Sequence, residues 1–467
     1  MYKQINSVIT FKNGQGISAR GTLLTSSQKT IVFEVYNPCI IVKLSEVLDE
    51  LSLAVGSDLV YRGKAVVSNL VNTGLMLVVS ATLVDSWADL TDKNYTAAEL
   101  ELKTGGFIDD WDSSRKLEVG YLVVVGELRS FLGELSRWVE RLDIENAAKD
   151  VTDINVQLEC EFFQALVGPV LARLDVLFAK FEAEAQKVNE EDLTIHKIFA
   201  QADLHPLMLR SPFFYRSYTK PLGYAGDYEM VNMMTRKEGR EGPTTYSQII
   251  NAYYYNIGPT VAHRNRIDIL FGYLSRLTDE AKAQGRQLRV LNVGCGPALE
   301  IQKFIREYET PEDCIFKLMD FNSETIDYTS GKLNKISDDL GKSINVEFIQ
   351  KSVHTLLQIS HKSTNEENID DYDFVYCAGL FDYLSDRVCS RLLKLFNKWV
   401  CDRGIVLSTN VCPSNPSRWS MEHNVDWYLI HRDEEGMLGI APKEGSHRVY
   451  LDETGFNVFL ESISSSE

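Results

Sequence analysis

Short apolar runs with few charges recur through residues 1 to about 100. The runs at 30–36, 40–44 and 75–80 are rich in β-branched and aromatic residues, which favour strands, and glycines separate them. A small all-β unit has to protect its edge strands, and closing the sheet on itself removes those edges. We therefore expect a small β-barrel over residues 1–110.

Apolar residues then take up helical spacing. Between Val124 and Arg141, and again between Ile154 and Val188, they recur every three or four positions. Two consecutive amphipathic helices predict a helical hairpin over residues 111–200, with a kink at Pro169. Their apolar faces can pack internally or against a second copy of the chain, so a homodimer is one expected outcome.

Residues 201–284 are rich in aromatic side chains. Prolines interrupt the first half of this stretch, and the spacing of apolar residues in the second half predicts one helix from Tyr246 to Leu277. We expect this helical region to cover the substrate site of the domain that follows.

Strand and helix patterns alternate from residue 285 to residue 467. The strand candidates are 288–293, 315–319, 345–349, 373–378, 404–409, 447–451 and 456–462. Strands that alternate with helices favour a parallel sheet with helices on both faces. The expected fold class is therefore α/β: a Rossmann-like, seven-stranded domain preceded by a helical region and an N-terminal small β-barrel.

Composition narrows the classes of partner. The 467 residues exceed one ordinary core, and the net charge of −18 disfavours nucleic acid, which requires clustered cations. No uncharged apolar run reaches about 18 residues and no cationic leader opens the chain, so we expect a cytoplasmic protein without stable membrane insertion. The eight cysteines are scattered without a Cys-x-x-Cys pair, so we expect free thiols and no metal site.

The first strand of the C-terminal region ends in a glycine turn, and the second ends in an acid. Gly294-Cys295-Gly296 follows the first strand, and Asp320 follows the second. Glycines let the backbone approach a ligand, and the carboxylate can accept hydrogen bonds from ribose hydroxyls. This arrangement is typical of nucleoside binding. Leu299 replaces the third glycine of the dinucleotide fingerprint, which indicates a ligand without a pyrophosphate.

These motifs resemble those of the class I S-adenosylmethionine-dependent methyltransferases. Residues 290–297 are similar to the family's first motif, 352–353 to its adenine-flanking position, and 373–384 to its fourth-strand motif. The resemblance implies S-adenosyl-L-methionine as the cofactor. It places cofactor contacts at Asn292, Gly294, Cys295, Gly296, Glu300, Asp320, Phe321, Asn322, Ser352, Val353, Cys377, Ala378 and Gly379.

Two positions depart from the family's pattern. Asn292 stands where an acid is common, two residues before the first glycine, and Ser352 stands where aspartate is frequent. An amide and a hydroxyl can still hydrogen-bond the ligand, but without the charge.

The segment Gly223–Asp227, with the sequence GYAGD, lies upstream of this domain. Asp227 is suited to cap a helix at 228–234. Together with the domain, the segment resembles a bacterial subgroup whose members make 3-hydroxy fatty acid methyl esters, which implies carboxyl O-methylation of an apolar carboxylic acid. Residues 1–110 resemble a PilZ-like barrel, but Arg20 has no arginine at the spacing that cyclic-di-GMP binding requires, so we do not expect dinucleotide sensing.

Candidate acceptor residues precede the glycine turn. An arginine one helical turn from His263 can hold a substrate carboxylate by a charge-assisted contact. A hydroxyl or phenol acceptor would instead need a general base, and His263 and Asp382 are the candidates. The residues expected to contact the acceptor are Tyr215, Tyr224, Asp227, Tyr254, Arg264, Arg266 and Tyr383.

Other interpretations stay open at this point. His423, Trp427 and His431 recur at helical i, i+4, i+8 spacing, which favours a structural helix face over a pocket. The acceptor could instead be a small aromatic or peptide-derived metabolite, methylated on nitrogen or oxygen. The chain could also be a regulatory or scaffold protein that uses the nucleoside fold to bind a ligand without catalysis.

Overall fold

The structure is a computed structural model, and it falls into two compact units. It describes residues 7–12, 18–27, 29–35, 42, 46–55, 58–72, 77–85, 96–114, 117–147, 156–189, 192–236, 240–353, 355–357 and 372–464. One unit comprises Met1–Val119, Val188–Phe199 and Pro221–Tyr224, and the other comprises Gly120–Lys187, Ala200–Lys220 and Ala225–Glu467. Each unit is described by itself.

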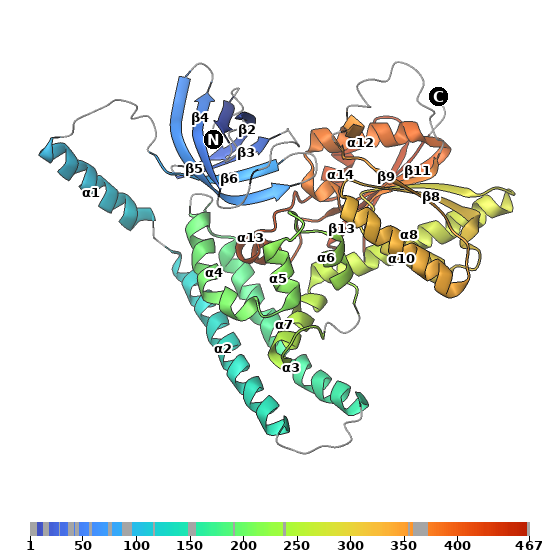
Figure 1. The fold of residues 1–467 in the computed structure, drawn as a ribbon, viewed down its shortest axis with the longest axis horizontal. Helices are drawn as coiled ribbons and strands as arrows, with labels where there is room; N and C mark the ends of the chain where they lie inside the picture. Colours follow the sequence, from blue (N-terminus) through green and yellow to red (C-terminus); the bar gives the residue numbers. More distant parts are fainter. Residues whose placement is uncertain are drawn as a thin grey trace. The chain divides into compact units, whose positions relative to one another are not determined.

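The first unit contains a closed barrel with the strand order β1-β2-β3-β6-β5-β4, drawn in blue in Figure 1. Its strands are β1 (Ser7–Lys12), β2 (Ser18–Ser26), β3 (Thr30–Val35), β4 (Val47–Val55), β5 (Asp58–Asn72) and β6 (Leu77–Leu83). Inward positions alternate with outward ones, as in β6, where Leu77, Val79, Ala81 and Leu83 are buried. The predicted small β-barrel is thus confirmed.

Two details concern the expected boundaries and strands of the barrel. Helix α1 (Ala97–Ser114) begins within the range 1–110, after the last barrel strand, and ends beyond it. The strand expected at 40–44 lies outside the described residues, apart from Val42, whose side chain belongs to the barrel core.

The second unit begins with two long helices, α2 (Val119–Ala147) and α3 (Val156–Ala185), which lie side by side. An ion pair between Lys180 and Glu127 joins them at 2.7 Å, and the rings of Tyr121 and Phe181 lie 5.4 Å apart. Pro169 is accommodated inside α3. The apolar face of α3 packs within the same unit, because Phe178 stacks on Tyr253 at 4.9 Å. Pairing with a second copy of the chain stays a prediction.

Five further helices lead to the C-terminal sheet: α4 (Leu193–Met208), α5 (Pro212–Thr219), α6 (Tyr228–Met233), α7 (Thr245–Asn256) and α8 (Gly258–Ala283). The prediction of one helix from Tyr246 to Leu277 was wrong, since α7 ends before Ile257 and α8 starts after it. Pro259 has no N–H to donate to the preceding turn, which disfavours a continuous helix here and suits the first turn of a new one. Gly258 is required there because a Cβ would lie 2.6 Å from the ring of Phe456.

The seven-stranded sheet has the order β12-β13-β11-β10-β7-β8-β9. Its strands are β7 (Leu288–Val293), β8 (Cys314–Asp320), β9 (Asn345–Gln350), β10 (Tyr372–Cys377), β11 (Val400–Val411), β12 (Ser446–Leu451) and β13 (Asn457–Ile463). Helices α8, α9 (Leu299–Glu307) and α10 (Ser323–Leu340) lie on one face, and α12 (Asp386–Trp399) and α14 (Glu434–Ile440) lie on the other (Figure 1). The predicted Rossmann-like, seven-stranded fold is confirmed.

The sheet is mixed, which corrects the expectation of a wholly parallel one. Strand β13 is antiparallel to both of its neighbours, β11 and β12. The connection from Leu451 to Asn457 is too short for a crossover and forms a hairpin instead. The carboxylate of Asp452 holds this turn by accepting hydrogen bonds from the backbone amides of Phe456 and Asn457, at 3.1 and 2.9 Å.

The interior of the sheet is apolar because its central strands are covered on both faces. Val290, Phe316, Phe374 and Leu407, from four adjacent strands, have no exposed side-chain surface and belong to one cluster. Helices α8 and α9 contribute Leu274 and other apolar residues to the same cluster. This core fixes the carboxyl ends of β7, β8 and β10 side by side, where the site lies.

Candidate functional site

The turn after β7 has left-handed backbone at alternate positions. The φ angles are +73° at Gly294, +51° at Gly296 and +49° at Ala298, which begins α9. Such angles favour glycine, and they let the backbone reverse direction within a few residues. The amides of Gly294 and Cys295 donate to the carbonyl of Met319, at 2.8 and 3.0 Å. Apart from Gly296 and its two chain neighbours, no described residue has an atom within 4 Å of the position of a Cβ at Gly296, so the turn is open there.

Asp320, at the end of β8, ties this turn to the next helix. Its Oδ2 accepts a hydrogen bond from the amide of Gly296 at 3.1 Å, and its Oδ1 accepts one from the amide of Asn322 at 3.0 Å. Burial raises the pKa of the Asp320 carboxyl, whereas these backbone hydrogen bonds lower it. The side chain of Asn322 caps α10 by accepting from the amide of Thr325. Phe321 lies between the two polar residues.

A buried acid lies beside the amide at position 292. Glu300, in the first turn of α9, accepts hydrogen bonds from Asn292 Nδ2 at 3.0 Å and from the hydroxyl of Tyr376 at 2.6 Å. Burial raises the pKa of Glu300, and the Tyr376 hydrogen bond lowers it. An acidic side chain from the adjacent helix therefore contacts the amide at position 292. Tyr376 was not among the predicted residues, because its position in β10 is typical of a core residue.

The exit of β10 is the third part of this edge. Gly379 follows Cys377 and Ala378, has a φ of +95°, and donates its amide to Thr409 Oγ1 at 3.2 Å. The guanidinium of Arg266 occupies the space that a side chain at position 379 would need, since its Nη1 lies 3.0 Å from the position of a Cβ at Gly379. A helix upstream of the sheet therefore contributes a cation to the strand exit.

Asp382 lies in the short 3-10 helix Phe381–Tyr383 that follows this exit. Its Oδ1 accepts a hydrogen bond from the amide of Val411 at 2.7 Å, and burial raises the pKa of its carboxyl to about 6. Arg432 fixes the same segment, donating to the carbonyl of Phe381 at 2.8 Å and to Asn410 at 2.7 Å. Arg432 was missed because no local pattern links it to residues that lie far earlier in the chain.

Tyr383 meets the upstream loop. Its hydroxyl accepts a hydrogen bond from Trp427 Nε1 at 3.0 Å, and the same hydroxyl lies 3.0 Å from the position of a Cβ at Gly226. Gly226 is therefore adjacent to the strand exit, as a residue of an acceptor site would be. The helical face expected for His423, Trp427 and His431 was wrong, because helix α13 (Arg418–Asn424) ends before Trp427 and Asp426 has left-handed backbone.

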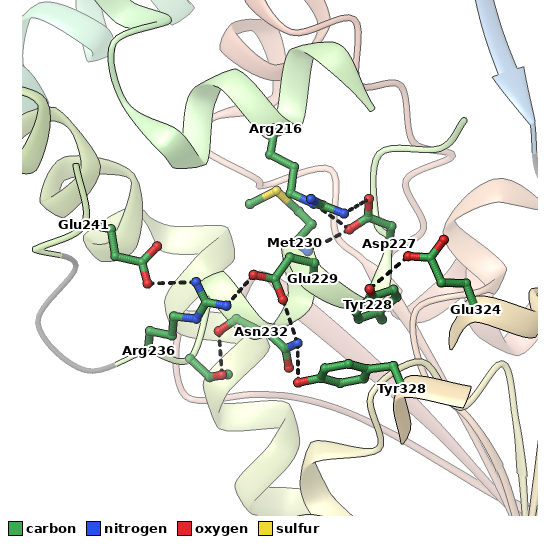
Figure 2. A network of polar contacts seen from close by, with 11 residues as sticks. Arg216, Asp227, Tyr228, Glu229, Met230, Asn232, Arg236, Glu241, Glu324 and Tyr328 are labelled. Carbon is green, nitrogen blue, oxygen red and sulfur yellow. Dashed lines mark hydrogen bonds and ion pairs between the residues drawn. The ribbon is translucent and has the colours of Figure 1, made fainter. Parts of the chain in front are cut away.

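Helix α6, which follows the segment Gly223–Asp227, is held by polar contacts on both sides (Figure 2). Arg216 of α5 donates two hydrogen bonds to the carboxylate of Asp227, at 3.0 and 2.8 Å. The same carboxylate caps α6, which confirms the predicted capping role. On the other side, the hydroxyl of Tyr228 donates to Glu324 at 3.0 Å and its ring stacks on Tyr328 at 4.4 Å. Helix α6 therefore lies beside the start of α10, close to the Asp320 edge.

Several predicted residues have other surroundings. Tyr215 is 55% exposed, whereas Tyr254 is buried and stacks on Phe213 at 5.7 Å. Ser352 Oγ accepts from the amide of Thr355, and the adjacent Val353 is buried. Tyr224 belongs to the other compact unit, so its place relative to this site is not described.

The two predicted arginines of α8, Arg264 and Arg266, differ in their surroundings. Arg264 donates to the carbonyls of Met234 and Tyr255, at 3.0 and 2.8 Å, and lies over the ring of Tyr255. Arg266 donates from Nη2 to His263 Nδ1 at 2.7 Å. Burial lowers the pKa of His263 well below its ordinary value, and the two neighbouring cations lower it further. His263 is therefore neutral at physiological pH.

A membrane-spanning helix and a metal site each place requirements on the described residues. Among the described residues, no helix is long and apolar enough to cross a bilayer. In the same part of the chain, no group of three or more histidine, cysteine, aspartate or glutamate side chains is placed to hold a metal ion.

The fold and the site define a Rossmann-like protein with a nucleoside-type edge. No protein-family model and no curated protein sequence matches the chain. Among solved structures, it is similar to a possible exported protein from Bordetella parapertussis, with 13% identity, a TM-score of 0.39 and coverage of 63% of this chain and 96% of that one. It is also similar to magnesium protoporphyrin IX methyltransferase from Synechocystis, with 11% identity, a TM-score of 0.35 and coverage of 54% and 99%. For the N-methyltransferase NodS from Bradyrhizobium japonicum, the identity is 14%, the TM-score 0.29 and the coverage 44% and 98%. At these values the likeness concerns the fold, and function is inferred from the residues of the site.

Proposed function

We propose that this chain is an S-adenosyl-L-methionine-dependent methyltransferase. The observation that carries the proposal is the open, left-handed turn at Gly294–Gly296, with the buried carboxylate of Asp320 hydrogen-bonded to it at the end of the adjacent strand. Nucleosides bind at the carboxyl edge of such sheets, where the order of strands reverses, and β7 and β10 form that point here.

The residues at this edge fit the cofactor's chemical parts. Each carboxylate oxygen of Asp320 accepts one backbone hydrogen bond and has a further lone pair for a ribose hydroxyl. The space in front of Gly296 admits a ligand close to the backbone. Leu299 replaces the third glycine of the dinucleotide fingerprint, which supports a ligand without a pyrophosphate. Ser352 and Val353 would flank the adenine.

When bound, the cofactor supplies a methyl group on a sulfonium, which an acceptor's nucleophile would take by in-line attack, with S-adenosyl-L-homocysteine as the leaving group. The contribution of the protein is to orient the two partners and to exclude water from them. Gly379 and Asp382 line the strand exit, and Arg432 holds that segment rigid through buried hydrogen bonds. A rigid exit keeps the acceptor in a single geometry.

For the acceptor, we propose the carboxyl group of a 3-hydroxy fatty acid, which would leave as its methyl ester. The segment Gly223–Asp227 resembles that subgroup, and Gly226 lies against Tyr383 at the strand exit. A carboxylate is ionised at neutral pH and needs no general base. His263 is not set up as a base, because its Nδ1 already accepts a hydrogen bond from Arg266.

Transfer from methyl-labelled cofactor to a panel of acids, amines and phenols tests both levels of the proposal. We expect label in an extractable ester of 3-hydroxy acids. Label in amines or phenols alone would keep the methyltransferase and refute the acid acceptor. Calorimetry addresses the scaffold alternative, since a folded protein that binds no S-adenosyl-L-methionine cannot be this enzyme.

Methylation of a small aromatic or peptide-derived metabolite is the second candidate. Asp382 favours it, because a carboxyl whose pKa is about 6 can accept a proton from a hydroxyl or ammonium acceptor near neutral pH. In that case Asp382→Asn should lower the rate at saturating substrate. With an acid acceptor the same variant should keep most of its rate.

A further inference from the structure

The side chains of Arg266 and His263 lie one turn apart on α8 and contact each other. Arg266 Nη2 is 2.7 Å from His263 Nδ1. A guanidinium can only donate hydrogen bonds, so Nδ1 must be the acceptor. An imidazole that accepts at Nδ1 carries its proton on Nε2. Arg266 therefore sets the tautomer of His263 and leaves an N–H donor at Nε2.

This N–H donor is buried, and the described residues offer it no acceptor. His263 is 9% exposed, and within the described part of the chain Nε2 has no hydrogen-bond partner. Buried donors in native proteins nearly always have an acceptor, from protein, water or ligand. An unpartnered one at a candidate site indicates an acceptor atom that a ligand supplies.

Arg266 likewise has no carboxylate partner in the part of the chain that the structure describes. Among the described residues, every carboxylate oxygen lies farther from its guanidinium nitrogens than 4.0 Å, the longest distance of an ion pair. Asp382 and Glu300 act on it only through longer-range attraction. Arg264, two residues earlier, is occupied by two backbone carbonyls and the ring of Tyr255. Of the two predicted arginines, only Arg266 is available to a ligand.

The position of Arg266 places this pair at the reacting edge. Its Nη1 approaches Gly379, where only the absence of a side chain leaves room, at the exit of β10. Strand β10 adjoins β7, which ends in the Gly294–Gly296 turn. A cation and a neutral N–H donor on two side chains in contact, one of them at the exit of β10, suit an oxyanion with two oxygens.

We propose that Arg266 and His263 form a carboxylate-binding pair. The guanidinium supplies charge and hydrogen bonds, and His263 Nε2–H supplies a further hydrogen bond. This inference rests on the proposed function, and two carboxylates are then available: that of the amino-acid part of S-adenosyl-L-methionine, and that of an acid acceptor. The pair positions either one and takes no part in bond breaking.

The test compares Arg266→Gln with Arg276→Gln, a matched control on the same helix whose arginine is half exposed and pairs only with Glu280 among the acids of the described residues. Calorimetry measures the affinity of each protein for S-adenosyl-L-methionine and for its decarboxylated analogue. If the pair holds the cofactor, the wild type and the control prefer the carboxylated form by about tenfold or more, and Arg266→Gln binds both forms equally.

If the pair holds the acceptor, Arg266→Gln keeps the wild-type affinity for both cofactor forms. Its affinity for 3-hydroxydecanoate, measured in the presence of S-adenosyl-L-homocysteine, then falls by about tenfold or more. His263→Leu should move the same quantity in the same direction, whereas His263→Gln keeps an N–H donor and should lie nearer the wild type. Circular dichroism and thermal unfolding identify any variant that fails to fold.

The outcomes separate the two proposals. A wild type that binds the cofactor, with Arg266→Gln indistinguishable from Arg276→Gln for all three ligands, overturns the carboxylate-binding pair alone. A folded wild type that binds neither cofactor form overturns the proposed function, and the pair with it. Should Arg266→Gln not fold, the contrast between His263→Leu and His263→Gln decides, and equal affinities in those two variants overturn the pair.

Discussion

Replacing Asp320 by asparagine tests the nucleoside edge directly. Each carboxylate oxygen accepts one backbone hydrogen bond, from Gly296 at 3.1 Å and from Asn322 at 3.0 Å. Asparagine has a single acceptor oxygen, so its NH₂ group would face one of the two backbone N–H groups. The variant therefore loses one hydrogen bond and leaves a buried donor without an acceptor.

The lost hydrogen bonds give an expected free-energy change both for the ligand-free protein and for its complex with the cofactor. An unsatisfied buried donor costs about 1–3 kcal/mol, so the ligand-free variant should be less stable by roughly that amount. A hydrogen bond to a charged group contributes about 1.5–3 kcal/mol, and a ribose hydroxyl would lose such a bond in the complex. The affinity for S-adenosyl-L-methionine should therefore fall roughly 10- to 150-fold.

Urea unfolding measures the first effect, and calorimetry with the folded variant measures the second. Asp339→Asn, an exposed change of the same kind on α10, is the matched control and should alter neither quantity. If folded Asp320→Asn binds the cofactor as tightly as the wild type, Asp320 does not bind the ribose, and the reasoning from the strand edge is refuted.

Three further changes probe the surrounding residues. Burial raises the pKa of Asp382 from its ordinary value of 3.8 to about 6 in the folded protein. The folded state therefore binds the proton more tightly than the unfolded state. This contributes roughly 3 kcal/mol of stability below pH 4, which is lost as the pH rises through 6. Urea unfolding at pH 4 and pH 7 should therefore show that Asp382→Asn gains on the wild type by about that amount at the higher pH; a constant difference would contradict the buried carboxyl. Tyr376→Phe removes one of two donors to Glu300 and should cost about 1–3 kcal/mol of unfolding free energy; a smaller cost would mean that water replaces the hydroxyl. Gly226→Ala places a Cβ 3.0 Å from the Tyr383 hydroxyl and should lower thermal stability by about 1 kcal/mol and slow turnover. Adding Tyr383→Phe removes the clashing oxygen and should restore stability. If the stability losses of the two single variants simply add in the double variant, the result counts against that contact.

Local patterns predicted the elements of the fold better than they predicted the connections between them. Strands β3 and β6 of the barrel and the seven strands of the sheet follow runs of apolar residues that located them, whereas β1, β2, β4 and β5 were not located. The antiparallel direction of β13 was missed because the direction of a strand depends on the length of the connection before it. Here that connection is a short turn held by Asp452. The break at Ile257 between α7 and α8 was missed because apolar spacing continues across Gly258-Pro259 although the backbone does not.

The candidate site divides along the same line. The sequence by itself determined the glycine turn, the acid at the end of β8 and the Asp227 cap, because each depends on backbone conformation or on residues a few positions apart. Only the tertiary structure showed that the buried acid Glu300 pairs with the amide at position 292, and that Arg266 rather than Arg264 faces the strand exit. Two arginines so close in sequence have the same chemistry. They differ in what α8 packs against on each side, and that depends on residues far away along the chain.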